Sequence, residues 1–219
     1  MSEVTDFETQ VSIIKAKRNV EQDAEEVGTI YRSMFTSAGI DTLDPEKFKE
    51  FLRFKGRRGE GNRHWISIQR HSGRLTADLP LLKKALQILV EESEPIADRI
   101  DRARATRIRG LGRAVISAIL LVAYPTRYGV YNAISQAGLR KIVKFPENFR
   151  SLSLGKQYDY VNQRLCELAA RYNISLWGLD FALGGLVPGS ERRRKEYDYP
   201  LAFGNWREYI DVTSKKSRP

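Results

Sequence analysis

Hydrophobic residues recur at helical spacing along most of this chain, and this periodicity constrains the fold more than any other feature. Apolar residues three or four positions apart lie on one face of a helix, which can then be buried. Such stripes are Ile30, Tyr31, Met34 and Phe35; Phe48, Phe51 and Leu52; Leu81, Leu82, Ala85, Leu86 and Leu89; Ile96, Ile100 and Ala103; and Tyr158, Val161, Leu165, Leu168 and Tyr172. Strand signals are few, since Val11 to Ile14 is ambiguous and Trp65 to Ile68 alternates only briefly. We expect an all-α fold of roughly eight to ten short helices.

Capping residues, prolines and glycines mark the expected helix boundaries. Three places pair an N-cap residue with a proline of the first turn: Asp44 with Pro45, Asp78 with Pro80, and Ser93 with Pro95. Gly39 predicts the end of a helix that starts at Gly28. Gly184 and Gly185 likewise predict the end of a helix that starts at Ser175.

Charge is distributed unevenly along the chain. The net charge is +10 with a pI near 9.7. The first 50 residues hold 11 acidic and 6 basic residues, whereas the remaining 169 hold 16 acidic and 31 basic. A basic body of this kind suits a polyanion, because each Lys or Arg placed on a phosphate releases counterions. Charge alone is also consistent with a role in solubility only.

Other features limit the class of protein. No apolar run reaches the length of a membrane span, and the polar N-terminus shows no signal peptide. The lone Cys166 excludes an internal disulfide and a cysteine-built metal site. The motifs of P-loop NTPases, serine hydrolases and zinc proteases are missing. We therefore expect a soluble cytoplasmic monomer without metal or other cofactor.

The segment from Arg107 to Val115 (RIRGLGRAV) joins two helices predicted over residues 95–107 and 113–124. Two glycines around one leucine make a tight turn, since glycine tolerates positive φ and lets a phosphate approach the backbone. The unpaired N–H groups that begin the second helix form an anion site at the positive end of its dipole. Six arginines surround this turn: Arg99, Arg102, Arg104, Arg107, Arg109 and Arg113. We predict DNA binding by Arg107, Arg109, Gly110, Leu111, Gly112 and Arg113, with an ordinary αα-hairpin as the alternative.

The span Ile108 to Asn132 (IRGLGRAVISAILLVAYPTRYGVYN) resembles the helix-hairpin-helix region of the DNA glycosylase superfamily. That family has Leu-Pro-Gly-Val-Gly, an apolar helix, and a loop that ends in a catalytic Asp. Here Gly110 and Gly112 match, Arg109 replaces the proline, and Asn132 lies at or close to the Asp position. The resemblance covers about 25 residues firmly and residues 80–187 loosely. It implies a multi-helix glycosylase-like fold that binds double-stranded DNA and flips a nucleotide.

Two departures from the family pattern bear on the chemistry. Bifunctional members carry a Schiff-base lysine early in the second helix, where this chain has Ala114, so the resemblance implies a monofunctional enzyme. An asparagine at position 132 cannot act as a base, although it can orient a water or bond a sugar. Asn132 is equally well placed as the N-cap of a helix over residues 133–143. Asp180 is a candidate for the missing catalytic carboxylate, and a surface acid is its alternative interpretation.

Aromatic residues are candidates for a role in base flipping. Base flipping needs one side chain, the wedge, that fills the gap left in the duplex, and an aromatic ring that stacks on the extruded base. His64 and Trp65 follow the basic loop 56–63 and could enter the duplex; the alternative is a flexible surface loop before a core tryptophan. Tyr128 and Tyr131 could stack on an extruded base, or could be ordinary packing residues. The basic run 192–195 suggests a solvated segment, with phosphate contact as a second interpretation.

Together these features predict a monofunctional DNA glycosylase-like enzyme that excises a damaged or modified base, for example a hypermodified viral one. The alternatives are a non-catalytic helix-hairpin-helix DNA reader in a restriction or phage-defence system and, with less support, an RNA-binding module. We expect one globular helical unit over residues 1–219. Its parts would be an acidic helical segment (1–50), a helix-hairpin-helix core (78–187) and a basic C-terminal wrap (188–219).

Overall fold

The computed structural model describes residues 3–53 and 68–187, and all regular secondary structure in these ranges is helical. This confirms the all-α prediction at the level of fold class. The chain divides into two units, residues 1–187 and 188–219, and every described residue belongs to the first. The predicted C-terminal wrap, the loop 56–63, and the wedge candidates His64 and Trp65 lie outside the described residues.

Eleven α-helices and three 3₁₀ helices occur within the described ranges. The N-terminal half contains α1 (Glu3–Ala16), α2 (Arg18–Tyr31), η1 (Arg32–Phe35), α3 (Ser37–Asp41), α4 (Pro45–Arg53), η2 (Gln69–His71), α5 (Ser72–Leu75) and α6 (Leu79–Val90). It is followed by α7 (Ile96–Ala105), α8 (Arg113–Ala123), α9 (Ala133–Ile142), η3 (Glu147–Ser151), α10 (Leu154–Tyr172) and α11 (Leu176–Gly185).

Most of the predicted caps are present, and two predicted boundaries are wrong. The Asp78 carboxylate accepts from the Leu81 N–H and begins α6, as expected. Gly39 does not end a helix, because Thr36 caps the separate short helix α3 that contains it. Ser93 is not a cap, since α7 begins after Pro95 without a side-chain cap. The glycine pair 184–185 forms the last two residues of α11, which ends at Gly185 as predicted.

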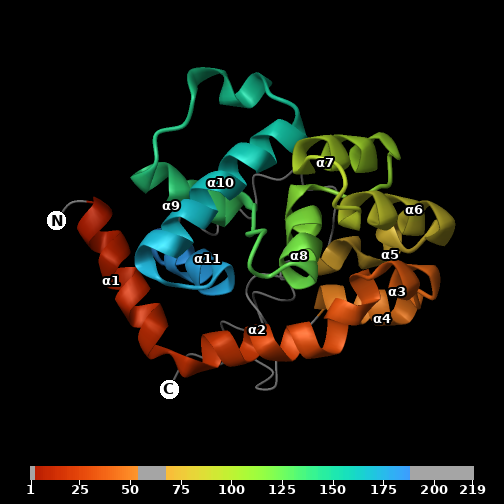
Figure 1. The fold of residues 1–219 in the computed structure, drawn as a ribbon, viewed down its shortest axis with the longest axis horizontal. Coiled ribbons are helices and arrows are strands. Elements are labelled where there is room, and N and C mark those ends of the chain that lie inside the picture. Colours follow the sequence, from red (N-terminus) through yellow and green to blue (C-terminus); the bar gives the residue numbers. More distant parts are fainter. Residues whose placement is uncertain (1–2, 54–67, 188–219) are drawn as a thin grey trace, which may run out of the picture. The chain divides into compact units, whose positions relative to one another are not determined.

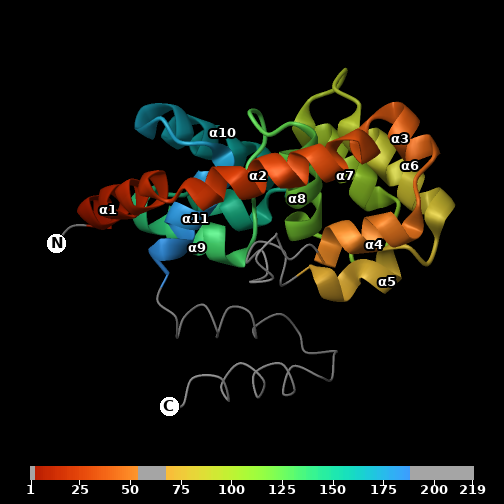
Figure 2. The same cartoon turned by 90° about the horizontal axis from the view of Figure 1, so that it is seen from below.

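Helix α8 forms the centre of the core, and all its residues from Val115 to Val122 are buried. Around it, α7 packs against α6 and α10, while α11 packs against α9 and α1 (Figure 1). The short helix α5 packs against α4, and α3 packs against α6 (Figure 2). None of the helices in the described part of the chain combines the length and apolar character that a membrane span requires.

The acidic N-terminal segment belongs to this same core. Phe7 and Val11 of α1 and Val27 of α2 are buried in the hydrophobic cluster that also contains α8. The Phe7 ring meets the edge of Tyr172 at the end of α10, with centroids 5.1 Å apart. The ambiguous stretch 11–14 is therefore helical, with Val11 and Ile14 on one buried face.

Candidate nucleic-acid interface

The turn between α7 and α8 has the predicted positive φ at one of its two glycines. Gly110 has a φ of +94°, which is left-handed backbone that favours glycine. Leu111 is 1% exposed and anchors the turn in the core. Gly112 is the extended N-cap residue of α8, and its carbonyl accepts from the Ile116 N–H at 3.0 Å. Leu111 therefore anchors the turn in the core, and of the two glycines only Gly110 has a backbone conformation that favours glycine.

The start of α8 is uncapped. Among the described residues no side chain bonds its first-turn N–H groups, in contrast to α9, α10 and α11, which have Asn132, Ser153 and Ser175. A side chain built on Gly112 would meet nothing within 4 Å among the described atoms. No side chain of the described residues therefore accepts from the N–H groups of the first turn, and the dipole of α8 favours an anion there.

The arginines around the turn have different roles. Arg107 and Arg109 are exposed, and neither pairs with a carboxylate within residues 3–53 and 68–187. Arg104 fastens the turn, because its guanidinium donates to the Leu111 carbonyl at 2.9 Å. Arg113 points toward α9: it donates to Gln136 Oε1 at 2.9 Å and lies over the Tyr131 ring at 4.6 Å.

Arg99 is near the turn in sequence but is buried, unlike Arg107 and Arg109. It is 2% exposed and donates to the Leu89 carbonyl and the Tyr128 hydroxyl. A guanidinium buried in this way connects the end of α6 to the loop after α8. Its contribution is therefore to packing, since no phosphate can reach it.

His71 of η2 lies against the turn. A Cβ built on Gly110 would be 3.1 Å from the His71 Cβ, so only a glycine fits there without displacement. Burial, and to a lesser extent the nearby charges of Arg70 and Arg74, lower the pKa of His71 to about 4. His71 is therefore neutral at pH 7. No sequence pattern connects this residue with the turn, because 39 positions separate it from Gly110 (110 − 71 = 39).

Asn132 is the N-cap of α9. Its Oδ1 accepts from the Ile134 and Ser135 N–H groups at 2.8 Å, and Ser135 Oγ accepts from the Asn132 N–H in return. This capping box confirms the cap interpretation. Because Oδ1 is engaged by two donors, only the Nδ2 group of the amide is left to face a substrate.

The loop that leads to Asn132 is held by α10. Asn162 accepts from the Gly129 N–H at 2.8 Å and donates to the Arg127 carbonyl at 2.9 Å. The Tyr158 hydroxyl donates to the Gly129 carbonyl at 3.0 Å. A side chain at Gly129 would meet Leu165 at 2.7 Å, so glycine permits this close approach. Sequence patterns did not identify these contacts, since they join residues about 30 positions apart.

The remaining candidates lie in or near this region. Tyr128 and Tyr131 are buried, and each ring packs at an angle against Tyr158. Packing therefore accounts for both tyrosines in this structure, and stacking on a base stays a prediction. Asp180 is 8% exposed on α11, so its interpretation as a surface acid is wrong. Helix α11 packs on α9, where the Gly138 backbone approaches the Leu183 carbonyl.

No protein-family model matches the chain, and no curated protein or solved structure matches it either. Within the described residues, no group of three or more His, Cys, Asp or Glu side chains is placed to hold a metal ion.

Proposed function

We propose that this protein binds double-stranded DNA by holding a backbone phosphate at the start of α8. The observation that carries the proposal is the uncapped first turn of α8 behind Gly112, where a Cβ built on Gly112 has no described atom within 4 Å. A phosphate there would accept from backbone N–H groups and gain from the helix dipole. Arg107 and Arg109 supply exposed charge on the same turn, where phosphate contacts fix the register of a protein on DNA.

The distribution of carboxylates supports this assignment. No Asp or Glu occurs between Asp101 and Glu147, a stretch that contains the turn, α8, α9 and Asn132. A phosphate approaching the start of α8 therefore meets no negative charge from this part of the chain. Surface helices ordinarily mix both signs, so a long basic stretch without acids favours a polyanionic partner.

A Gly112→Ser variant tests the proposal. Serine is a favoured N-cap residue, so its hydroxyl will accept from a first-turn N–H and occupy the phosphate position. We expect stability within a few tenths of a kcal/mol of wild type. Affinity for a duplex should fall about tenfold or more, measured by fluorescence anisotropy.

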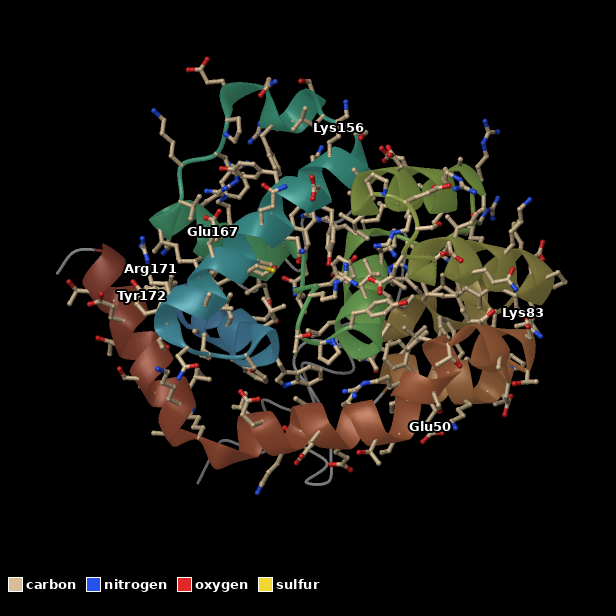
Figure 3. The ribbon with its side chains drawn as sticks, viewed as in Figure 1. Glu50, Lys83, Lys156, Glu167, Arg171 and Tyr172 are labelled. Atoms are coloured by element: carbon tan, nitrogen blue, oxygen red, sulfur yellow. The ribbon has the colours of Figure 1, made fainter. Side chains whose placement is uncertain are left out.

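Lys156→Ala is the matched control, because it removes an exposed charge at the start of α10 (Figure 3). It should bind DNA nearly as wild type does. A Gly112→Ser protein that is folded and binds with unchanged affinity would contradict the proposal. A wild-type protein that binds no duplex at low salt would also contradict it.

Hydrolytic base excision is the second candidate function. The observation that favours it is the buried carboxylate of Asp180 on α11, the helix that packs on α9 behind Asn132. In this scheme the Asn132 amide would donate a hydrogen bond to the sugar or water, and a carboxylate would activate the water. Asn132 cannot take the proton itself.

Base release distinguishes an enzyme from a DNA reader. DNA pools with normal, damaged and hypermodified bases are incubated with the protein, and freed bases are detected by mass spectrometry after alkali cleavage of abasic sites. We expect release that is lost in Asp180→Asn, while duplex affinity is retained. Duplex binding without any released base would leave the non-catalytic reader.

A further inference from the structure

A cavity of about 360 Å³ lies at the C-terminal end of α8, at the opposite end of this helix from the turn. Helix α2 contacts both α8 and α11, and it forms one wall of the cavity (Figure 1). The apolar part of the lining includes Leu121, Val122 and Pro125, from the last turn of α8 and the segment after it. This volume is at the lower end of the range of small-molecule sites, which is about 300–1,000 Å³.

One side of α2 brings opposite charges to this cavity. The residues that line it from this side are Glu21, Glu25, Gly28 and Arg32. Their spacing of four, three and four positions places them along one face of a helix. Arg32 directly follows the last residue of α2 and keeps a helical backbone, so it continues this face. The cavity therefore has an acidic end and a basic end on a single helix.

The Arg32 side chain folds back along α2 and reaches the end of α8. Its Nε donates to the Val122 carbonyl at 3.2 Å. Its Nη2 lies 2.6 Å from the position that a Cβ on Gly28 would occupy, so the guanidinium lies where this glycine has no side chain. No residue in the described part of the chain accepts from Nη1 or Nη2 of Arg32. These N–H groups are the planar donors that bind a carboxylate.

Two carboxylates lie on the other side of Gly28. Glu21 Oε1 accepts from Ser175 Oγ at 2.5 Å, and this bond joins α2 to the start of α11. The Glu25 side chain is exposed and pairs with no cation in residues 3–53 and 68–187, Arg32 included. Three residues separate Glu25 from Gly28, where the guanidinium lies, which is roughly 4.5 Å along the helix axis. One small dipolar ligand can therefore contact both charges.

We propose that this cavity binds a free amino acid with an apolar side chain. The carboxylate of the ligand accepts from Arg32, and its ammonium donates to Glu25. Its side chain packs on the apolar lining from α8 and the segment that follows. The proposal goes beyond DNA binding and does not depend on it, because Gly112 and the first turn of α8 do not line the cavity.

Calorimetric titration of the full chain with L-leucine, L-methionine and L-phenylalanine tests the ligand class. The matched probes are the N-acetyl form of each, which lacks the ammonium, and the amide of each, which lacks the carboxylate. We expect at least one of the three amino acids to bind with a Kd in the millimolar range or below. Loss of either charge should weaken its binding more than about tenfold, since a hydrogen bond between charged groups is lost.

Two variants test the site. Glu25→Gln and Arg32→Met each remove one charge from the cavity. The controls are Glu8→Gln on α1 and Arg171→Met in the last turn of α10, which remove exposed charges elsewhere (Figure 3). We expect the cavity variants to lose more than about tenfold in affinity for the amino acid, and the controls to bind as wild type does. Thermal unfolding establishes that each variant is folded. Should Arg32→Met not fold, Glu25→Gln decides, because its side chain is exposed and makes no ion pair with another described residue.

The outcomes separate this inference from the proposed function. Failure of all three amino acids to bind at millimolar concentration would overturn it, as would acetylated and amidated forms that bind as tightly as the amino acids. Equal affinities of the cavity variants and the controls would overturn the site. Gly112→Ser should bind the amino acid as wild type does while losing affinity for DNA, so the failure of one proposal leaves the other standing.

Discussion

At the scale of single residues, the backbone of Arg107 is the most informative feature. It has a φ of +59° just after the end of α7, in the left-handed conformation that glycine or asparagine usually adopts there. At the end of α10 the equivalent conformation falls on Asn173, with a φ of +46°. An arginine in this conformation costs about 1 kcal/mol, and such strain concentrates at functional sites.

Replacing Arg107 with glycine should therefore separate stability from binding. We expect Arg107→Gly to raise the free energy of unfolding by about 1 kcal/mol, measured by urea denaturation, and to weaken duplex binding. Arg109→Gly is the control, because Arg109 has no positive φ and a glycine there should lower stability. A less stable Arg107→Gly protein would show that the conformation is not strained.

His71 makes a prediction about pH. Its pKa is about 4 in the folded protein, below the value near 6.5 expected when unfolded, so the unfolded chain binds the proton more tightly. The free energy of unfolding is therefore highest above pH 6.5, and it decreases as the pH falls from 6.5 to 4. The loss should be on the order of 3 kcal/mol, since one pKa unit corresponds to about 1.4 kcal/mol.

The His71→Leu variant isolates this effect, because leucine keeps the Cβ that contacts Gly110 and does not titrate. Urea unfolding of both proteins between pH 4 and 8 gives the comparison. We expect wild type to become less stable relative to the variant as pH falls. Parallel curves over this range would rule out a depressed pKa at His71.

At the scale of elements, the capping box of α9 gives Asn132 a role independent of any chemistry. Asn132→Ala leaves two N–H groups of α9 without acceptors and should cost about 1 kcal/mol of stability. Asn132→Asp keeps the acceptor and adds a negative charge at the helix start, so it should be at least as stable as wild type. Thermal unfolding of the two variants measures the difference.

Of the two Asn132 variants, Asn132→Asp also tests whether Asn132 takes part in base excision. If Asn132 only caps α9, Asn132→Asp will release bases as the wild type does. If its amide donates to the substrate, Asn132→Asp will lose base release while remaining stable, because a carboxylate has no N–H to donate. An equal loss of stability in both variants would contradict the capping role.

At the scale of the whole molecule, binding of DNA to the folded state should raise its stability. The chain has a net charge of +10, so its positive charges repel one another in the free protein. Duplex DNA at about a hundred times its Kd should add about 2.7 kcal/mol, seen as a higher Tm. The shift should disappear at high salt and in Gly112→Ser. A shift that persists in both would point to another mode of binding.

Local interactions allowed much of this protein to be read from its sequence. Apolar periodicity and caps such as Asp78 and Asn132 act within one helical turn, and they predicted most helices. The turn of Gly110, Leu111 and Gly112 was also predictable, because its backbone depends on residues next to one another. The helix break at Thr36 was missed, since the glycine three residues later resembled an ordinary stop.

Only the tertiary structure decided which charged side chains are exposed and can contact a ligand. Sequence proximity grouped Arg99 with Arg107 and Arg109, yet packing buries Arg99 against Tyr128 and leaves the other two exposed. Burial of Asp180, the contact of His71 with Gly110 and the anchoring of Gly129 by Asn162 all join or cover residues that are distant in sequence. The local turn follows from its own residues, whereas the surface around it follows from how the helices pack, because long-range contacts determine burial.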